Sequence, residues 1–570
     1  NRLYGDINVS YKILPELKAS VITRANFLNY FSDARTATGG LELDAYSITN
    51  GQFSEFNYEG RLEYNKRFGN FGVRQLLGGN LMNQNRRQNN GATVGGLSVP
   101  NLYSLTASRD RPSVGNSWLD YRINSAFANG GLDYKNMIFV DWSVRNDWVS
   151  SLPENLRSYL YPSVATSFVF SDLLGRSFKN VLSFGKLRAA YGQSGQAPAA
   201  YTLNLAYGLG QPYGANPTMS VPTTVYDPAI KPALTNEIEV GTELQFFKNR
   251  LGVDFTWYQK NGKDQIIPLG VTPSSGSGTV WINAGLLRSQ GWDLVLNGSP
   301  IKSRNWNLDI QLNLSRNIST TLDLDTAKNL RNRSLGAAAF GPSVNARVGE
   351  RYGTFVGTRN LIDDKTGLPV INAAGNWVRQ QNQILGNALP EFMGGGVANL
   401  SYKNWSLSTT FSFQKGGMFF STTRLFTLYS GLVEETVGLN DKGNPKRDAP
   451  SAGGGVRVDG VLANGTPTTV YVDAQTYYGN MFGVHNFFLQ EASYVKLAEA
   501  RISYTLPAGK LIKGMKPATI SFISRNPWLI WAPAKDWGVD PSEIENFNQF
   551  FEGGQLPPVR SFGLNISFGF

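Results

Sequence analysis

The stretch Ser561-Phe-Gly-Leu-Asn-Ile-Ser-Phe-Gly-Phe570 decides the fold, because it alternates without a break between two kinds of residue. Its even-numbered positions are apolar, and its odd-numbered positions are Ser, Gly and Asn. Successive side chains of a β-strand point to opposite faces, so the pattern predicts a strand with one oily and one wet face. A soluble sandwich strand can show the same alternation, and the rest of the chain must decide between the two.

The alternation recurs between Trp306 and Ser315, where Leu308, Ile310 and Leu312 interleave with polar residues. Five polar side chains on one face cannot form a protein core, and a long apolar row facing water is avoided by soluble proteins. Lipid outside and water inside satisfy both faces. The same register appears near residues 3–13, 251–258 and 405–414. The repeats therefore predict an all-β chain, a transmembrane antiparallel β-barrel.

Connections alternate between tight and long, as they do between the periplasmic and extracellular sides of such barrels. Tight turns are expected at Leu14-Pro15-Glu16, Gly69-Asn70, Lys135-Asn136, Lys248-Asn249 and Lys403-Asn404. Long Gly-, Pro- and Asn-rich segments span about 86–117, 197–234, 267–279, 323–391, 418–487 and 532–558. Loops of this size would be unusual inside a compact soluble domain.

About 17 strands are predicted in one continuous architecture over residues 1–570. They cover roughly 2–13, 17–36, 54–68, 71–85, 118–134, 137–151, 158–174, 181–196, 235–247, 250–266, 280–298, 304–322, 392–403, 405–417, 491–505, 515–526 and 559–570. Bacterial single-chain barrels have an even count, so we expect an odd number of further strands upstream. The chain is thus interpreted as the carboxy-terminal part of a larger barrel protein.

Composition excludes several classes of protein. The 570 residues include no Cys, which rules out disulfide-stapled modules and cysteine metal sites. No run of 18 uncharged apolar residues predicts a membrane helix, and residues 1–6 show no signal-peptide core. The net charge of +11 could suggest nucleic acid, but the basic residues form small groups beside connections, such as Lys510, Lys513 and Lys516, and fit a solvated rim.

Catalytic machinery is not expected. His485 is the only histidine, so a barrel hydrolase, the enzyme alternative, would depend on it. Gly192-Gln-Ser-Gly195 and Gly394-Gly-Gly396 lack the Lys-Ser/Thr partner of a phosphate loop and are interpreted as tight bends. Glu237, Glu239 and Glu243 share one strand face, where we expect them to meet Arg and Lys of adjacent strands or of a plug.

An ordered set of segments resembles the SusC-like TonB-dependent transporters of Bacteroidetes. The segments include Lys186-Leu-Arg-Ala-Ala-Tyr-Gly-Gln-Ser-Gly195, Leu234-Thr-Asn-Glu-Ile-Glu-Val-Gly241, Leu389-Pro-Glu-Phe-Met-Gly-Gly395, Glu491-Ala-Ser-Tyr-Val-Lys-Leu497 and Ser503-Tyr-Thr-Leu-Pro507. The resemblance covers most of the chain from about residue 186 onward. It implies a 22-stranded barrel of which this chain holds strands six to 22, with the plug and the TonB box upstream.

The resemblance also implies a function and partners. It implies TonB-dependent import of a bulky nutrient, an oligosaccharide or an oligopeptide, across the outer membrane, with a SusD-like lipoprotein as a lid and no cofactor. Lipid and lipopolysaccharide would surround the barrel, TonB would act through the upstream part, and no nucleic acid is involved. The alternative is a passive or scaffolding barrel within a larger secretion or surface assembly; the missing amino-terminal part would discriminate between the two.

Aromatic rings in the long segments are the candidate cargo contacts, because sugars stack on exposed rings. They are Tyr201, Tyr207, Tyr213, Tyr477, Tyr478, Phe482, Trp531 and Trp537. The alternative assigns them to the interfacial girdle. Phe568 and Phe570 resemble the carboxy-terminal signal of barrel assembly. The stretch Asp363-Asp364-Lys-Thr-Gly367 lacks the spaced acidic ligands of a calcium loop and is predicted to be an ordinary turn without metal.

Overall fold

The computed structural model describes residues 1–210, 213–272, 274, 276–325, 329–507, 516–544, 550–554 and 556–568. The chain divides into two compact units. The first comprises residues 1–172, 187–240 and 260–286, and the second comprises residues 173–186, 241–259 and 287–570. Four strands are divided between the two units: β8 (Leu182–Gln196), β12 (Ala233–Phe246), β13 (Leu251–Gly270) and β14 (Thr279–Lys302).

All 17 predicted strands are confirmed, and they belong to one hydrogen-bonded sheet that also includes the short β11 (Thr224–Tyr226), parallel to β14. The other long strands are β1 (Arg2–Leu14), β2 (Leu17–Thr36), β3 (Ala45–Phe68), β4 (Phe71–Ala92), β5 (Ser113–Tyr134), β6 (Ile138–Val149), β7 (Ser158–Val169), β15 (Trp306–Asp323), β20 (Pro390–Tyr402), β21 (Trp405–Gly416), β26 (Tyr494–Leu506), β27 (Ala518–Trp531) and β29 (Ser561–Ser567). β3 and β4 extend beyond their predicted ends, because their paired residues continue into segments that the sequence marks as polar loop.

Six strands of the second unit, β15, β20, β21, β26, β27 and β29, pair antiparallel in this order and confirm the two-faced pattern. One cross-strand row is entirely apolar: Leu308, Leu400, Leu407, Ile502, Phe522 and Leu564. The adjacent row on the opposite face is entirely polar: Asn307, Ser401, Ser406, Ser503, Ser521 and Asn565. A one-residue slip at any pairing would mix these rows, so the faces fix the register.

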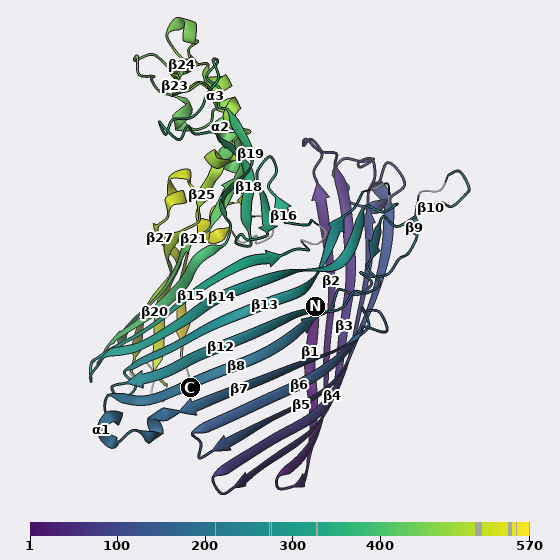
Figure 1. The fold of residues 1–570 in the computed structure, drawn as a ribbon, viewed down its shortest axis with the longest axis vertical. Coiled ribbons are helices and arrows are strands. Elements are labelled where there is room, and N and C mark those ends of the chain that lie inside the picture. Colours follow the sequence, from purple (N-terminus) through teal and green to yellow (C-terminus); the bar gives the residue numbers. More distant parts are fainter. Residues whose placement is uncertain are drawn as a thin grey trace. The chain divides into compact units, whose positions relative to one another are not determined.

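The first unit repeats this arrangement over β1 to β7, which lie side by side in purple and blue in Figure 1. Its apolar rows include Tyr11, Ala19, Leu62, Leu77, Ala128, Val144 and Pro162. Its opposite face carries ion pairs such as Arg24 with Glu59 and Arg145 with Asp147. The seven strands therefore have one apolar face and one face that carries charged residues.

The predicted tight turns are confirmed, and positive φ angles occur in four of them. Gly69, Lys135, Asn136, Lys248, Asn249 and Lys403 all have φ between 51° and 63°. The expected bend at Gly394-Gly-Gly396 is wrong, because these residues lie within the continuous strand β20. A Cβ at Gly394 would lie 2.4 Å from the carbonyl oxygen of Asn313, so glycine permits close approach of neighbouring strands there. Gly192 and Gly195 likewise lie within β8.

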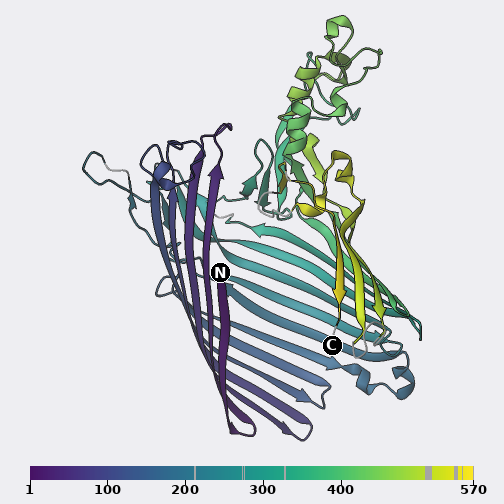
Figure 2. The same cartoon turned by 180° about the vertical axis from the view of Figure 1, so that it is seen from behind.

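The long segments of the second unit fold into a loop module (residues 332–388, 418–493, 532–544 and 550–554) beyond the ends of β20, β21 and β27 (Figure 1). Figure 2 shows the same module from behind, in green and yellow. Its strands are β16 (Asn332–Ala337), β17 (Ser343–Arg347), β18 (Thr354–Asn360), β19 (Arg379–Asn387), β22 (Met418–Ser421), β23 (Val456–Val461), β24 (Pro467–Val472), β25 (Leu489–Glu491) and β28 (Phe551–Glu552). Its α-helices are α2 (Thr422–Tyr429) and α3 (Ala474–Met481).

An apolar cluster holds the loop module together, with Phe355, Phe420, Leu425 and Phe488 fully buried. The 3₁₀ turns of the module are η5 (Glu434–Thr436), η6 (Pro450–Ala452), η7 (His485–Phe488), η8 (Pro533–Trp537) and η9 (Pro541–Glu543). Elsewhere the chain has η1 (Leu105–Ala107), η2 (Phe170–Leu173), α1 (Arg176–Lys179), β9 (Gly208–Leu209) and β10 (Met219–Ser220). Within the described ranges, no helix combines the length and the apolar composition needed to cross a membrane.

Candidate ligand-binding surfaces

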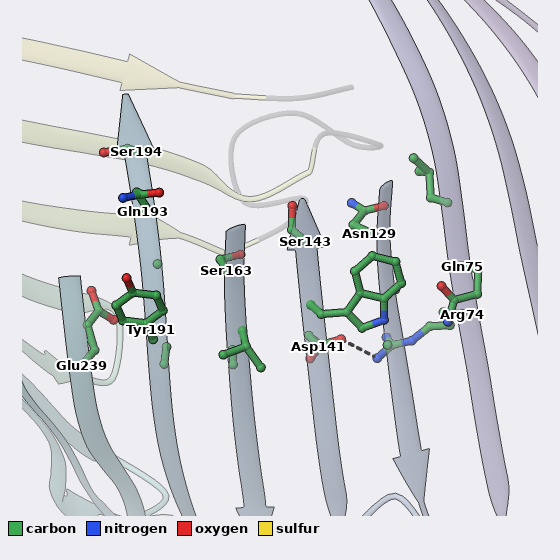
Figure 3. Close-up of a pocket in the computed structure, with 18 of the residues that line it drawn as sticks. Arg74, Gln75, Asn129, Asp141, Ser143, Ser163, Tyr191, Gln193, Ser194 and Glu239 are labelled. Carbon is green, nitrogen blue, oxygen red and sulfur yellow. Dashed lines mark hydrogen bonds and ion pairs between the residues drawn. The ribbon is translucent and has the colours of Figure 1, made fainter. Parts of the chain in front are cut away.

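A cavity of about 720 Å³ lies on the first unit and is lined by residues of β3 to β8 and β12 (Figure 3). The register places Leu76, Asn129, Ser143 and Ser163 in one cross-strand row, so four neighbouring strands present one face to it. Figure 3 shows Gln193, Ser194, Tyr191 and Glu239 lining the same cavity from β8 and β12. The cavity therefore offers hydroxyl, amide and carboxylate groups together with the rings of Tyr64, Trp142 and Tyr191.

An ion pair crosses the wall of this cavity. Arg74 Nη2 lies 3.2 Å from Asp141 Oδ1, and the two residues reach each other across Gly131. A Cβ at Gly131 would lie 2.4 Å from that carboxylate oxygen and 2.7 Å from the guanidinium nitrogen. Glycine is thus required sterically for the pair. Both partners are about half exposed, so the pair positions charge on the wall more than it stabilises the fold.

Glu237, one of the three carboxylates predicted to share a strand face, meets a cation of an adjacent strand as expected. Lys260 Nζ lies 2.8 Å from Glu237 Oε1, and Gln193 donates a 2.8 Å hydrogen bond to Asn236 in the neighbouring strand. Glu237 and Glu239 both line the cavity. The other lining groups were not among the predicted contacts, although the period-two alternation of β5 to β8 already marks them as polar-face residues.

The predicted contacts in residues 197–217 lie on the first unit and are exposed to different extents. Tyr213 is 83% exposed, and Tyr207 is also exposed, at the start of the hairpin of β9 and β10. Tyr201 has a φ of 61° and its hydroxyl accepts a 3.3 Å hydrogen bond from the backbone N–H of Asp120 in β5. The loop therefore presents two free rings and holds a third against a strand.

The predicted contacts on α3 pack together instead. Tyr478 is 8% exposed and its hydroxyl donates to the carbonyl oxygen of Glu435. Burial raises the pKa of the Tyr478 phenol to about 12, so it stays neutral. Tyr477 contacts the ring of Trp377 at 5.1 Å between centroids, and Phe482 contacts Tyr429 at 5.1 Å. These rings contribute to the core of the loop module, and their contact with cargo stays a prediction.

Trp531 and Trp537 lie on either side of the start of the last long segment. Trp531 ends β27 and is half exposed. Trp537 lies in η8, and the guanidinium carbon of Arg424 from α2 lies 5.4 Å from its ring centroid. A cation over an indole face is a favourable contact, so Trp537 joins η8 to α2. Phe568 is exposed, and Phe570 lies outside the described residues.

His485 lies in η7, where its Nδ1 accepts a 3.1 Å hydrogen bond from the backbone N–H of Thr358. Burial, and secondarily the charge of Arg379, lowers the pKa of the imidazole. Asp363 forms the predicted turn, since its carboxylate accepts from the N–H and the hydroxyl of Thr366 at 2.9 and 2.8 Å. Among the described residues, no group of three His, Cys, Asp or Glu side chains is arranged to hold a metal ion.

Sequence reasoning missed two anchors of the last long segment. Lys496 in β26 is 4% exposed, and its ammonium binds Asp540, Ser542 and Glu543. Glu552 is also buried, and its carboxylate accepts hydrogen bonds from the hydroxyls of Ser421 and Thr423, about 130 positions earlier in the chain. For the first anchor, the local signal in the sequence is a lysine that stands between the apolar residues Val495 and Leu497 of a strand.

Residues 5–478 match the family model described as "TonB dependent receptor-like, beta-barrel". The chain is similar to TonB-dependent receptor P26 of Formosa agariphila, with 26% identity over 79% of this chain and 46% of that protein. It is also similar to TonB-dependent receptor P3 of the same organism, with 23% identity over 94% of this chain and 54% of that protein. The chain thus spans about half the length of the curated relatives it matches.

Solved structures share the fold. The RagAB peptide transporter aligns with 99% of this chain and 62% of its own, at a TM-score of 0.73 and 18% identity. The RagAB peptide importer in its "open-open" state aligns with 100% of this chain and 62% of its own, at a TM-score of 0.76 and 18% identity. At this level of identity the likeness concerns the fold alone.

Proposed function

Since the chain belongs to the TonB dependent receptor-like, beta-barrel family, we propose that it forms the wall and outer loops of an importer that takes a bulky nutrient across the outer membrane. Members of this family are outer-membrane proteins, and the apolar rows of both units suit a lipid-facing surface. The cargo we propose is an oligosaccharide or an oligopeptide. The proposed partners are TonB and a SusD-like lipoprotein over the loop module.

The observation that carries this proposal is the cavity on the polar strand face. Its wall presents Asn129, Ser143, Ser163 and Gln193, which can bond the hydroxyls of a sugar or the amides of a peptide. Tyr191 supplies a ring for stacking in the same cavity. RagAB, a structure with the same fold, is a peptide importer, which supports a polymeric cargo without deciding between the two classes.

The loops supply a second element of the proposal. Tyr207 and Tyr213 present exposed rings on a segment without charged residues between 202 and 226, where cargo can stack. The proposal contains no catalytic step. His485, the single histidine, is engaged by the N–H of Thr358, so the chain moves its cargo by binding and release.

The test is purification of the native, full-length complex without added ligand, followed by mass spectrometry of proteins and small molecules. We expect a co-purifying lipoprotein and a trapped oligosaccharide or peptide. The double variant Tyr207→Ala/Tyr213→Ala should retain less of that ligand, whereas Tyr11→Ala, on the apolar face of β1, removes an exposed ring without this effect. A barrel that purifies with secretion components and no lipoprotein would contradict import and favour the scaffold.

A further inference from the structure

Positive charge is concentrated in eight short segments of the sequence. Residues 12–18, 66–71, 133–138, 170–181, 247–250, 302–306, 402–405 and 507–517 contain 15 Lys and Arg against three Asp and Glu. The resulting excess of 12 compares with a net charge of +11 for all 570 residues. The remainder of the chain is therefore nearly neutral, and the first seven of these segments each join two described strands.

Aromatic residues accompany this charge in a repeated order. Tyr134-Lys-Asn136, Phe178-Lys-Asn180, Phe247-Lys-Asn249 and Tyr402-Lys-Asn404 each place a ring before a lysine and an asparagine. Lysine is an unusual choice for the backbone conformation required: Lys135 has a φ of 52° and Lys403 a φ of 51°. Gly or Asn would adopt this conformation with less strain, so the backbone conformation does not account for lysine at these positions.

In the second unit, one cluster of these residues forms what we call turn patch 2, comprising Lys302, Arg304, Trp306, Tyr402, Lys403 and Trp405. The register joins the three rings, with Trp306 opposite Tyr402 and Tyr402 opposite Trp405. Trp306 and Tyr402 lie 4.2 Å apart between centroids, and Lys403 Nζ lies 5.3 Å from the centroid of Tyr402. The row continues into Ile520 and Ile566, so the rings belong to the apolar face.

The cations of turn patch 2 have no anionic partner. Within the described part of the chain, Lys302, Arg304 and Lys403 form no ion pair, and all three are exposed. Three uncompensated positive charges beside a band of Trp and Tyr give a surface that is apolar on one side and cationic at its edge. That combination fits the boundary between acyl chains and charged headgroups.

The first unit carries the same arrangement in turn patch 1, comprising Lys66, Arg67, Phe68, Phe71, Tyr134 and Lys135. Phe71 pairs with Phe68 and with Tyr134. The ring centroids of Phe71 and Tyr134 lie 4.8 Å apart. Lys66 and Lys135 lie over Phe68 and Tyr134 at 5.5 and 5.3 Å. Lys66 and Arg67 also pair with Glu16 and Asp133, whereas Lys135 forms no ion pair with any residue that the structure describes.

We propose that turn patches 1 and 2 bind the phosphate groups of anionic phospholipids in the periplasmic leaflet of the outer membrane. Charge complementarity selects an anion, and the adjacent rings select one that is attached to acyl chains. Tight turns of outer-membrane barrels face the periplasm, which places both patches at that leaflet. The inference rests on the membrane location of the family and not on the cargo, so it can fail while the importer stands.

The test measures lipid binding to the full-length protein in detergent by native mass spectrometry, with phosphatidylglycerol and phosphatidylcholine as probes. The test variant carries Lys302→Gln, Arg304→Gln and Lys403→Gln. The control variant carries Lys365→Gln, Lys442→Gln and Lys535→Gln, which remove three exposed lysines of the long segments, including one that lies 3.4 Å from the ring centroid of Tyr471. Both variants lose the same charge.

Wild type and the control variant should prefer phosphatidylglycerol to phosphatidylcholine. In the test variant, the ratio of phosphatidylglycerol to phosphatidylcholine binding should fall about fivefold for each cation removed. Phosphatidylcholine binding should not change. Equal preference in the test and control variants would overturn the proposal. Displacement of phosphatidylglycerol by equimolar inorganic phosphate would assign the patches to free phosphate and overturn the lipid assignment.

A second variant keeps the proposal testable if the triple variant does not fold. Lys403→Asn removes the ammonium while Asn tolerates the φ of 51° at this position. It should fold as a heat-modifiable barrel and lose about fivefold in phosphatidylglycerol preference. Unchanged preference in this variant would equally contradict the proposal.

Discussion

Substitution of Lys496 by Met should release the last long segment of the loop module from β26. The ammonium of Lys496 donates to Asp540 Oδ2 at 3.1 Å, Ser542 Oγ at 2.8 Å and Glu543 Oε1 at 2.8 Å. An ammonium has three donors, so this geometry satisfies all of them. Methionine has a similar length and fills the same space, but it leaves two carboxylates without a cation.

The size of the effect follows from burial. Removing one partner of a buried ion pair costs about 3–5 kcal/mol. Asp540 is nearly as buried as Lys496, whereas the Glu543 side chain is one third exposed and can regain water. We therefore expect a loss of about 2–3 kcal/mol in the local free energy of opening, which corresponds to roughly 30- to 150-fold faster amide exchange.

Hydrogen–deuterium exchange of peptides covering residues 533–544 measures this directly. Lys535→Met is the matched control, because Lys535 lies in the same segment and is exposed. Lys496→Arg keeps a cation and should restore most of the protection. Unchanged exchange at 533–544 in Lys496→Met would refute the reasoning, as would an equal change in the control.

Two further predictions concern the strands and the loop module. Gly394→Val should severely lower the fraction of protein that folds as a heat-modifiable barrel, because the added Cβ would lie 2.4 Å from the carbonyl oxygen of Asn313. Gly563→Val is the control and should not lower it, because no atom lies within 4 Å of a Cβ at Gly563. Equal yields of the two variants on gel electrophoresis would count against the close approach of strands at Gly394. His485 has a lowered pKa in the folded state, so its contribution to stability is complete above the unfolded value of about 6.5 and is lost as pH falls through the folded value. The protection of the Thr358 amide, measured as its exchange rate relative to the intrinsic rate at the same pH, should therefore fall on acidification in wild type and not in His485→Gln.

The strand order and the two faces were predictable from sequence because their signal is local. Leu308 and Asn307 are neighbours in the chain, and their separation onto opposite faces follows from the period of two. Four of the five tight turns were predictable for the same reason, since Gly or Asn marks them in the local sequence. The glycine run 394–396 was misinterpreted because its cause is the carbonyl oxygens of neighbouring strands, which the local sequence does not reveal.

The contacts of the loop module were less predictable because they join distant segments of the chain. Glu552 meets Ser421 across 131 positions, and Arg379 bonds the carbonyl oxygen of Asn480 across 101. The sequence around Glu552 and Arg379 gives no indication of these partners. The rings of the long segments could be named, but their exposure could not: Tyr213 is free, whereas Tyr478 lies in the core of the loop module.

The two anchors together give the last long segment a defined mechanical role. Lys496 fixes η9 to β26, and the hydroxyls of Ser421 and Thr423 fix Glu552 to the start of α2. Three positions before Asp540, the ring of Trp537 lies under the guanidinium of Arg424 from the same helix. Because the segment is attached both to β26 and to α2, movement at one attachment strains the contacts at the other. We therefore expect the loop module and the ends of β26 to open as one cooperative unit, with exchange rates that change together in Lys496→Met.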